Sequence, residues 1–397
     1  MSIYNDLLSY LKMKKILLIT PRFPFPILGG DKDRFVGIAN ALAKKNIIDV
    51  ICISDKYYQK DQSTSKLSYK IKIFRINFIC RIIYSIIFLF KGNPLQISFY
   101  YSKAAETYIQ NKIYEYDSVI FHGIRSAQYL SKSFKGRKIL EMTDLTSLNF
   151  KKIYKKMPYY NPLKYLYFIE SYLIKKYENN ISEKFNKIIL ISKNDLLEEK
   201  NIQFKKKITI IPSGASINPR AYKFYDNNYK IIFLGNIKYY PNKIACYNFA
   251  KNVMPKINKY FKDVEFHIIG KINFIDKFIL GKNNKIKIHG PIINIKKILK
   301  NAICGINNVD ISTGFQTKVL NYMSYGLPTL SLKKFKKNEF KNNKEIIYFK
   351  SDIELIQKIS KLKTNKKFSE GISKTCYLNI KKNYSWNKRL YKYQKLL

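Results

Sequence analysis

The sequence is short of acidic residues, of histidine and of any module that reads nucleic acid. Its 397 residues contain 27 Asp and Glu against 74 Lys and Arg, which gives a formal net charge of +47. Lys, Asn, Ile, Tyr and Phe are conspicuous together, as an AT-rich coding bias makes them, and this bias explains most of the basic excess. The lysines are spread along the chain and no nucleic-acid-binding signature is present, so we predict no nucleic-acid partner. The charge favours an anionic lipid surface or a nucleotide instead.

The sequence also lacks the patterns of disulfide-rich, metal-binding and membrane-spanning proteins. Its 5 cysteines are odd in number, scattered and mostly inside apolar runs, so we expect reduced cytosolic core thiols. The most apolar run, residues 78–90, contains Arg81 and is shorter than the about 20 residues of a spanning helix. It predicts either a buried helix or a helix at a membrane interface, because its surroundings are basic. No secretory signal opens the chain; we expect a cytoplasmic protein, with peripheral contact at the inner face of the plasma membrane left open. The cysteines are Cys52, Cys80, Cys246, Cys304 and Cys376.

What the sequence does have is a regular alternation of buried strands and helices. A basic start at Met13 leads into a buried strand at 16–20, a Gly29-Gly30 turn, a helical pattern from Phe35 and a second strand at 47–53. This order is a βαβ unit. The turn lacks the G-x-G-x-x-G spacing of dinucleotide-binding proteins. Residues 1–12 are either an extension or a misassigned start. The other predicted strands are 118–121, 138–140, 188–192, 208–211, 231–236, 264–270, 286–290 and 302–306, with helices from Ala127 to Leu130 and at 164–185, 243–260 and 293–300.

The length and the two βα series predict two domains. A chain of 397 residues exceeds one ordinary core. Two series of parallel strands form two Rossmann-like, doubly wound domains that face each other across a cleft. Trp386 is predicted to anchor a C-terminal helix. The predicted parts are an N-terminal domain at 13–217 on the acceptor side, a linker at 218–230, a nucleotide-binding domain at 231–375, and a C-terminal helix at 376–397 that returns to the first domain.

A short segment near residue 320 has the features of an anion site. Gly314 opens a polar loop, a short amphipathic helix follows, and Gly326 suits the left-handed position that ends a helix. Free N–H groups from Phe315 to Lys318 at the start of the helix, with the lysine beside them, would attract an anion. An ordinary loop–helix connection is the alternative.

Several polar side chains follow strands of the first series. His122 ends one strand, and Glu141 and Asp144 end the next, at the edge of a parallel sheet where catalytic groups collect. For His122 a structural role stays open, and for Asp144 so does a helix cap. Asp33, in the helix after the Gly-Gly turn, is best explained as a helix cap. His267 and His289 lie in or beside buried strands, and we expect structural roles for both.

The ordered set of motifs resembles a known family, the retaining glycosyltransferases of family four, which have two Rossmann-like domains in the GT-B arrangement. Within that family the chain is most similar to the branch of bacterial sugar transferases associated with polysaccharide export. The resemblance spans nearly the whole chain. The matching segments are ILLITPRFPFPILGGDKDR, GNPLQISFYYS, YDSVIFHGIRSAQYL, LEMTDLTSLNF, IILISKND, ITIIPSG, FLGNIKYYPNKIA and STGFQTKVLNYMSYGLP.

The resemblance implies an enzyme, its substrates and a set of site residues. It implies a retaining hexosyltransferase that uses a nucleoside diphosphate sugar, needs no other cofactor and no metal, and acts on a glycan or lipid-linked acceptor in surface polysaccharide synthesis. Lys318 would neutralise the departing diphosphate, and Asp144 would orient the acceptor or stabilise positive charge on the sugar. The implied catalytic residues are Asp144, His122 and Lys318, and the implied substrate-binding residues are Gly29, Gly30, Arg34, Glu141, Asn236, Lys238, Gly314, Phe315, Gln316, Thr317 and Asn321.

The sequence departs from the family where the family is most recognisable. Thr313 and Asn321 occupy the positions of two family glutamates, and Asn236 and Asn242 occupy positions that often hold Arg and Lys. Asn321 can still bond a ribose hydroxyl, without charge assistance. The alternative function is therefore a degenerate GT-B protein that binds nucleotide, glycan or a partner enzyme without transfer. A sugar-nucleotide epimerase is a third alternative, for which no acid–base pattern is visible.

Overall fold

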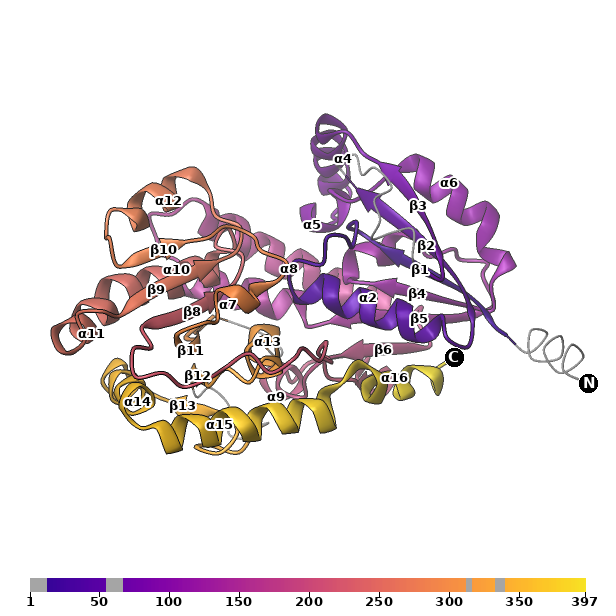
Figure 1. Cartoon of the computed structure of the whole chain (residues 1–397). Coiled ribbons are helices and arrows are strands. Elements are labelled where there is room, and N and C mark those ends of the chain that lie inside the picture. Colours follow the sequence, from indigo (N-terminus) through magenta and orange to yellow (C-terminus); the bar gives the residue numbers. More distant parts are fainter. Residues whose placement is uncertain (1–12, 55–66, 312–315, 333–339) are drawn as a thin grey trace, which may run out of the picture.

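The computed structural model describes residues 13–54, 67–311, 316–332 and 340–397. Within them the chain forms two α/β domains, each built on a parallel sheet (Figure 1). The first sheet has the order β3-β2-β1-β4-β5-β6-β7 and the second the order β10-β9-β8-β11-β12-β13. This confirms the predicted fold class. Thr313, Gly314 and Phe315, which belong to the segment predicted to bind an anion, lie outside the described residues.

The central strands of the first sheet, such as β1 and β4, are buried on both faces, which is why they read as continuous apolar runs. Along β1, Leu17 and Ile19 point into one core, and Ile16 and Leu18 point into another. The strands are β1 Lys15–Thr20, β2 Ile47–Ser54, β3 Lys70–Arg75, β4 Ser118–His122, β5 Arg137–Thr143, β6 Lys187–Leu190 and β7 Ile208–Ile210. The helices are α2 Gly30–Leu42, α4 Phe78–Phe90, α5 Leu95–Ser98, α6 Lys103–Lys112, α7 Thr146–Lys156, α8 Leu163–Ser182 and α9 Asn194–Glu198.

The second domain repeats this plan. The chain crosses from the first sheet to the second between Ile210 and Lys230. The strands are β8 Lys230–Leu234, β9 Glu265–Ile269, β10 Ile286–Ile288, β11 Ala302–Asn307, β12 Thr329–Leu332 and β13 Ile347–Phe349. The helices are α10 Tyr240–Asn248, α11 Met254–Tyr260, α12 Phe274–Gly281, α13 Thr317–Ser324, α14 Asp352–Thr364 and α15 Lys366–Asn379, and a π-helical segment, Phe249–Val253, joins α10 to α11.

Some predicted elements differ from the structure. The predicted helix 293–300 is only a 3-10 turn at Ile295–Lys297, and the helix expected through Ala127 is the 3-10 segment Ile124–Tyr129. The strands β3, β12 and β13 were not predicted: β3 alternates Lys with apolar residues and is only half-buried, and β12 and β13 have only 4 and 3 residues.

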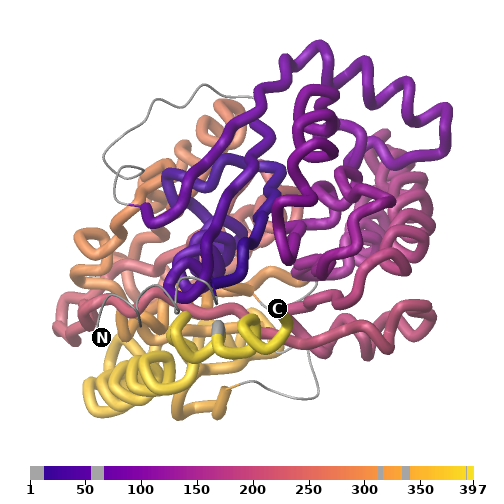
Figure 2. Tube along the Cα trace, turned by 90° about the vertical axis from the view of Figure 1, so that its right-hand side faces the viewer, coloured from indigo at the N-terminus to yellow at the C-terminus, as the bar shows by residue number. Residues whose placement is uncertain are grey.

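The last helix, α16 (Trp386–Gln394), lies beside α2 of the first domain (Figures 1 and 2). The Trp386 ring fills the space in front of two glycines: a Cβ on Gly37 or Gly214 would come within 2.6 Å of it. The expected anchoring role of Trp386 is confirmed. The end of the chain therefore belongs to the core of the first domain, although it follows the second domain in sequence.

Two helices of the first domain expose large apolar side chains. On α4, Phe78 is 62% exposed, Ile83 49% and Phe90 88%. Of the two predictions for residues 78–90, the buried helix is therefore wrong. On α8, Leu163, Tyr165, Leu166, Phe168, Ile169 and Tyr172 are exposed in the same way. Of the helices described, none combines the length and the hydropathy needed to span a bilayer.

Candidate active site

At the carboxyl-end edges of the two sheets, a glycine of the first domain contacts a helix of the second. Gly30, the first residue of α2, lies so close to the start of α13 that a Cβ there would be 2.0 Å from Thr317 Oγ1. Gly29 precedes it with φ 100°, a backbone conformation that favours glycine. The Gly29-Gly30 turn thus lets the first domain touch the α13 N-terminus of the second.

The α13 helix begins and ends as its sequence predicts. Gln316 precedes the first helical residue, Thr317, and Gly326 has φ 73° with its N–H donating to Met323 O at 2.9 Å. Val319 and Met323 pack inward. Tyr322 anchors the helix, because its hydroxyl accepts a hydrogen bond from Leu234 N at 2.6 Å.

Lys318 stands in the first turn of α13 and is buried. Its Nζ donates to Asn242 Oδ1 at 2.9 Å and lies 4.1 Å from the centre of the Phe233 ring. The Asn242 amide in turn donates to Asn236 O at 3.0 Å. Burial lowers the pKa of Lys318 to about 7, since among the described residues no carboxylate neutralises the ammonium. Lys318, Asn236 and Asn242 therefore form one polar group beside the helix N-terminus.

Two predicted substrate-binding residues of this domain make few side-chain contacts. Lys238 is exposed, and its N–H donates to Asn236 Oδ1 at 3.2 Å. Asn321 is half-buried, and its carbonyl accepts from Ser324 Oγ at 2.8 Å. Both side chains remain accessible to a ligand.

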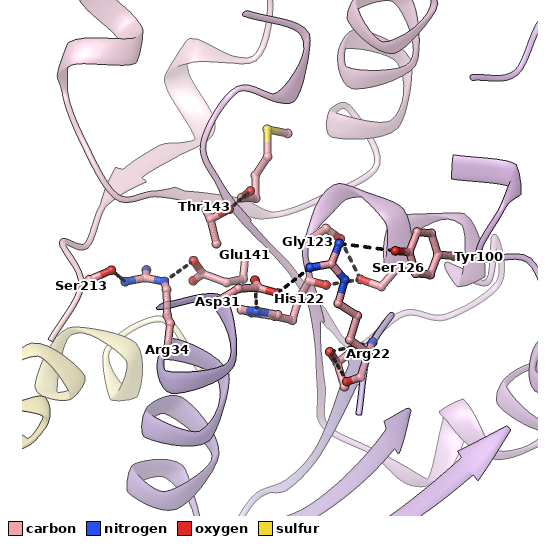
Figure 3. Close-up of polar contacts among 12 residues, drawn as sticks. Arg22, Asp31, Arg34, Tyr100, His122, Gly123, Ser126, Glu141, Thr143 and Ser213 are labelled. Carbon is pink, nitrogen blue, oxygen red and sulfur yellow. Dashed lines mark hydrogen bonds and ion pairs between the residues drawn. The ribbon is translucent and has the colours of Figure 1, made fainter. Parts of the chain in front are cut away.

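On the first domain, His122 and Asp31 form a pair (Figure 3). His122 ends β4, is 3% exposed, and its Nε2 lies 3.0 Å from Asp31 Oδ1. Burial alone would raise the pKa of Asp31, but the hydrogen bond from His122 and the charges of His122, Arg22 and Arg125 outweigh it and hold that pKa well below its usual range. His122 Nδ1 is buried and has no hydrogen-bond partner among the described residues. Asp31 is thus an ionised group at the start of α2.

Asp144 follows a strained residue at the end of β5. Thr143 has φ 70°, which is rare for a β-branched residue and costs on the order of 1–3 kcal/mol. Such strain is concentrated at functional sites. The next helix, α7, has Leu145 as its N-cap, so Asp144 is not the helix cap that we kept as an alternative. Asp144 is half-buried at the sheet edge.

Arg34 and Glu141 belong to the interior instead of a ligand site. Arg34 Nε donates to Glu141 Oε1 at 2.8 Å, and one Nη donates to Tyr393 OH at 2.7 Å and to Ile211 O at 2.9 Å. The Tyr393 hydroxyl also donates to the Glu141 carboxylate. Both side chains are at most 1% exposed. We therefore reassign Arg34 and Glu141 to a buried network that ties α2, β5 and α16 together.

Asp33 also has a different role from the one expected. The N-cap of α2 is Gly29, with no side-chain cap bond, and Asp33 Oδ1 accepts from Ser216 Oγ at 3.4 Å. Burial raises the pKa of Asp33 to about 6. The cap prediction for Asp33 is wrong because glycine, not the carboxylate, starts the helix.

His267 and His289 are joined in the second sheet. His267 Nδ1 lies 2.9 Å from His289 Nε2, and burial lowers the pKa of His267 to about 4. His267 is buried, whereas His289 is exposed, and the structural roles expected for both stay a prediction. Among the residues that the structure describes, no group of three His, Cys, Asp or Glu side chains could hold a metal ion.

Sequence reasoning missed a basic cluster beside the His122–Asp31 pair. Tyr100 lies among three arginines: Arg22 Nη2 donates to its hydroxyl at 3.4 Å, and the guanidinium carbons of Arg81 and Arg125 are 5.4 Å and 5.5 Å from its ring centre. The three arginines come from separate segments, so no local motif could have revealed them. The only signal was Arg81 itself, a charge inside an apolar run.

The fold and these sites define a two-domain GT-B protein, and comparison with known proteins agrees. Residues 228–365 match the family model described as "Glycosyl transferases group 1". No curated protein matches the chain. Together with the fold, the family-model match supports a glycosyltransferase.

Solved structures match over nearly the whole chain. Anabaena Alr3699/HepE in complex with UDP and glucose is 11% identical with a TM-score of 0.69, covering 96% of this chain and 98% of that one. A mutant of S. aureus TarM in complex with fondaparinux, alpha-GlcNAc-glycerol and UDP is 12% identical, with a TM-score of 0.67 and coverage of 97% and 99%. Sucrose-phosphate synthase from Thermosynechococcus elongatus is 11% identical, with a TM-score of 0.68 and coverage of 96% and 98%. At these identities the likeness establishes the fold.

Proposed function

We propose that the protein transfers a hexose-type sugar, with retention, from a nucleoside diphosphate sugar to a growing lipid-linked surface glycan of the capsule, lipopolysaccharide or exopolysaccharide type. The observation that carries the proposal is the α13 N-terminus with buried Lys318, inside the segment that matches the glycosyltransferase model. The complexes of Anabaena HepE with UDP and with UDP-glucose support a nucleotide-sugar donor of this kind.

The donor diphosphate would lie at the start of α13. Free N–H groups at a helix N-terminus attract phosphate, and the Thr317 and Lys318 end of α13 faces the Gly29-Gly30 turn. Lys318 supplies the cation and Asn321 a hydrogen-bonding side chain for the ribose. No cofactor other than the nucleotide sugar takes part in the proposed reaction.

The transfer breaks the bond between the sugar C1 and the diphosphate oxygen and forms a bond from C1 to the acceptor oxygen on the same face. The acceptor proton passes to the departing diphosphate, whose charge the α13 amides and Lys318 stabilise. Asp144 and the His122–Asp31 pair line the acceptor side, where a carboxylate would stabilise positive charge developing on the sugar.

We also propose that the protein docks on an anionic leaflet through α4, α8 and α12. On α12, Phe274 and Phe278 are exposed. The carboxylates of α8 and α12, namely Glu170, Glu178 and Asp276, are at most 2% exposed, and α4 has none, so no carboxylate of these helices faces outward. Such a face suits acidic lipid.

A donor-turnover assay tests transfer. The purified protein is incubated with a panel of UDP-, GDP- and dTDP-sugars, and the release of nucleoside diphosphate and the anomer of the transferred sugar are measured. Turnover of one donor with an α-linked product from an α-donor is expected. Binding of a nucleotide sugar without any turnover would instead favour the degenerate GT-B protein, for which Asn321 in place of a glutamate is the supporting observation.

A further inference from the structure

Three arginines converge on one tyrosine at the acceptor side, and one of them is buried with no counter-ion among the described residues. Arg81 projects from the inner side of α4 and is 3% exposed. Its guanidinium carbon lies 5.1 Å from the Phe99 ring centre and 5.4 Å from that of Tyr100, and its Nε has no hydrogen-bond partner within the described residues. Burying a cation without an anion is costly. An anion bound beside Arg81 would offset that cost.

Arg125 and Arg22 add charge to the same place. Arg125 Nη2 donates to Gln96 Oε1 at 2.7 Å, while its Nε is buried and unpaired within the described part of the chain. Arg22 reaches from the end of β1 to the Tyr100 hydroxyl. Burial lowers the pKa of Arg125, and the charge of Arg22 lowers it further. Burial would raise the pKa of Tyr100, yet the charges of these arginines lower it overall.

Two carboxylates nearby are already engaged, and a third, Asp144, acts on Arg125 through its charge. Asp31 is 3.0 Å from His122 Nε2 and 3.8 Å from Arg22. Glu170 accepts hydrogen bonds from the backbone N–H groups of Leu95 at 2.7 Å and Gln96 at 3.1 Å. The positive charge of the cluster is therefore only partly offset by the protein.

We infer that Arg22, Arg81 and Arg125 form a second oxyanion-binding subsite around Tyr100, which takes a negatively charged group of the sugar acceptor. Guanidinium groups present paired donors that match phosphate and carboxylate oxygens. This inference rests on the proposed function, since it assigns the subsite to the acceptor of that reaction.

The position of the subsite explains how it would serve transfer. Arg22 contacts both Tyr100 and Asp31, so the cluster is continuous with the His122–Asp31 pair (Figure 3). Arg81 lies on the inner side of α4, whose outer side exposes apolar residues. A phosphate carried by a hydrocarbon chain would place its charge against Arg81 and its chain along α4, so we expect a lipid phosphate to bind more tightly than a free one.

The test is a calorimetric titration of the full chain, saturated with UDP so that the donor site is filled. The probes are inorganic pyrophosphate, geranyl diphosphate and glucuronate. We expect one equivalent of a diphosphate probe to bind, and Arg22→Gln and Arg125→Gln each to weaken it by about tenfold or more. Arg137→Gln, at an exposed site at the start of β5, is the matched control and should bind as the native protein does.

The outcomes separate the two proposals. Geranyl diphosphate binding more tightly than pyrophosphate identifies a lipid-linked source, equal binding a soluble phosphate, and binding of glucuronate alone an acidic sugar. Equal affinity of native and Arg125→Gln proteins for every probe, or no binding at all, overturns the subsite. Failure to bind UDP counts against the proposed function, and the probes are then titrated without UDP, where the arginine variants are compared in the same way.

Discussion

The chemistry of Lys318 depends on its burial more than on its position in the sequence. Its Nζ contacts an amide oxygen and an aromatic face, and its pKa falls to about 7. A lysine with that pKa is partly neutral near physiological pH, and a bound diphosphate would restore its charge. The residue is thus suited to respond to the donor.

This predicts a pH-dependent donor affinity. Below the Lys318 pKa of about 7 the ammonium is charged before UDP arrives, whereas above it binding must take up a proton. The UDP affinity of the native protein, relative to that of Lys318→Met, should therefore fall by up to about tenfold per pH unit above pH 7. Calorimetry between pH 6 and about 9 measures both proteins, and the ratio removes the titration of UDP itself. A ratio that does not change with pH would remove Lys318 from the donor site.

At the scale of the element, α4 is notable because it exposes many large apolar side chains to solvent. Its exposed apolar side chains recur on successive turns while its one arginine points inward. A helix of this kind is stable in the protein because α5 packs on it. The outward face remains available to a membrane.

Vesicle sedimentation tests α4. The triple variant Ile79→Ser, Ile83→Ser, Ile86→Ser removes apolar area from the exposed face, and the loss of about 1–2 kcal/mol per side chain should reduce partitioning onto acidic vesicles at least tenfold. Ile353→Ser with Leu378→Ser is the control, because these exposed residues lie on α14 and α15, away from α4 (Figure 1). If the native protein remains in the supernatant after sedimentation with acidic vesicles as well as with neutral ones, membrane docking is refuted.

The helix α16 contributes one residue, Tyr393, to the buried polar network of the first domain. The Tyr393 hydroxyl accepts from Arg34 and donates to Glu141, both buried in the first domain. The ring belongs to the apolar core shared by α2 and β1.

Removing this hydroxyl should destabilise the first domain. Tyr393→Phe leaves Arg34 and Glu141 each short of a partner, which costs about 1–3 kcal/mol. Urea unfolding followed by circular dichroism should show a lower midpoint than the native protein. Tyr391→Phe, two residues earlier and 61% exposed, should leave the midpoint unchanged. If both variants unfold alike, the network does not stabilise the domain.

At the scale of the whole molecule, several contacts between described residues join the two domains. Besides Gly30 and Thr317, Tyr239 OH donates to Asn149 Oδ1 at 2.9 Å and Lys156 Nζ lies 3.1 Å from Asp310. Met157 and Ile311 share a small apolar cluster. One of these contacts, between Gly30 and Thr317, leaves no room for a methyl group at Gly30.

Gly30→Ala should separate the domains at the donor site. Its methyl group would lie 2.5 Å from Thr317 Cβ, which forces a shift, so UDP affinity should fall by about tenfold, a loss of about 1.4 kcal/mol. Adding Thr317→Gly removes that Cβ and should recover most of the affinity. Gly371→Ala, in open space on α15, is the control. Lost affinity without any recovery in the double variant would mean that the turn acts through its backbone instead of this contact.

The sequence by itself determined the fold class, most of the buried strands and the α13 helix with its glycine end. Periodicity and helix-end signals are local, so they can be recognised without knowledge of the tertiary contacts. Short strands such as β12 and β13 carry too few residues for a local signal, and they form because neighbouring strands accept their hydrogen bonds.

Only the tertiary structure decided which polar residues face a ligand. Arg34 and Glu141 stand beside candidate residues in the sequence, yet they bond each other and Tyr393 from the far end of the chain. Arg22, Arg81 and Arg125 are far apart in sequence and meet around Tyr100. Charge pairing depends on distance in space, which the order of residues does not contain.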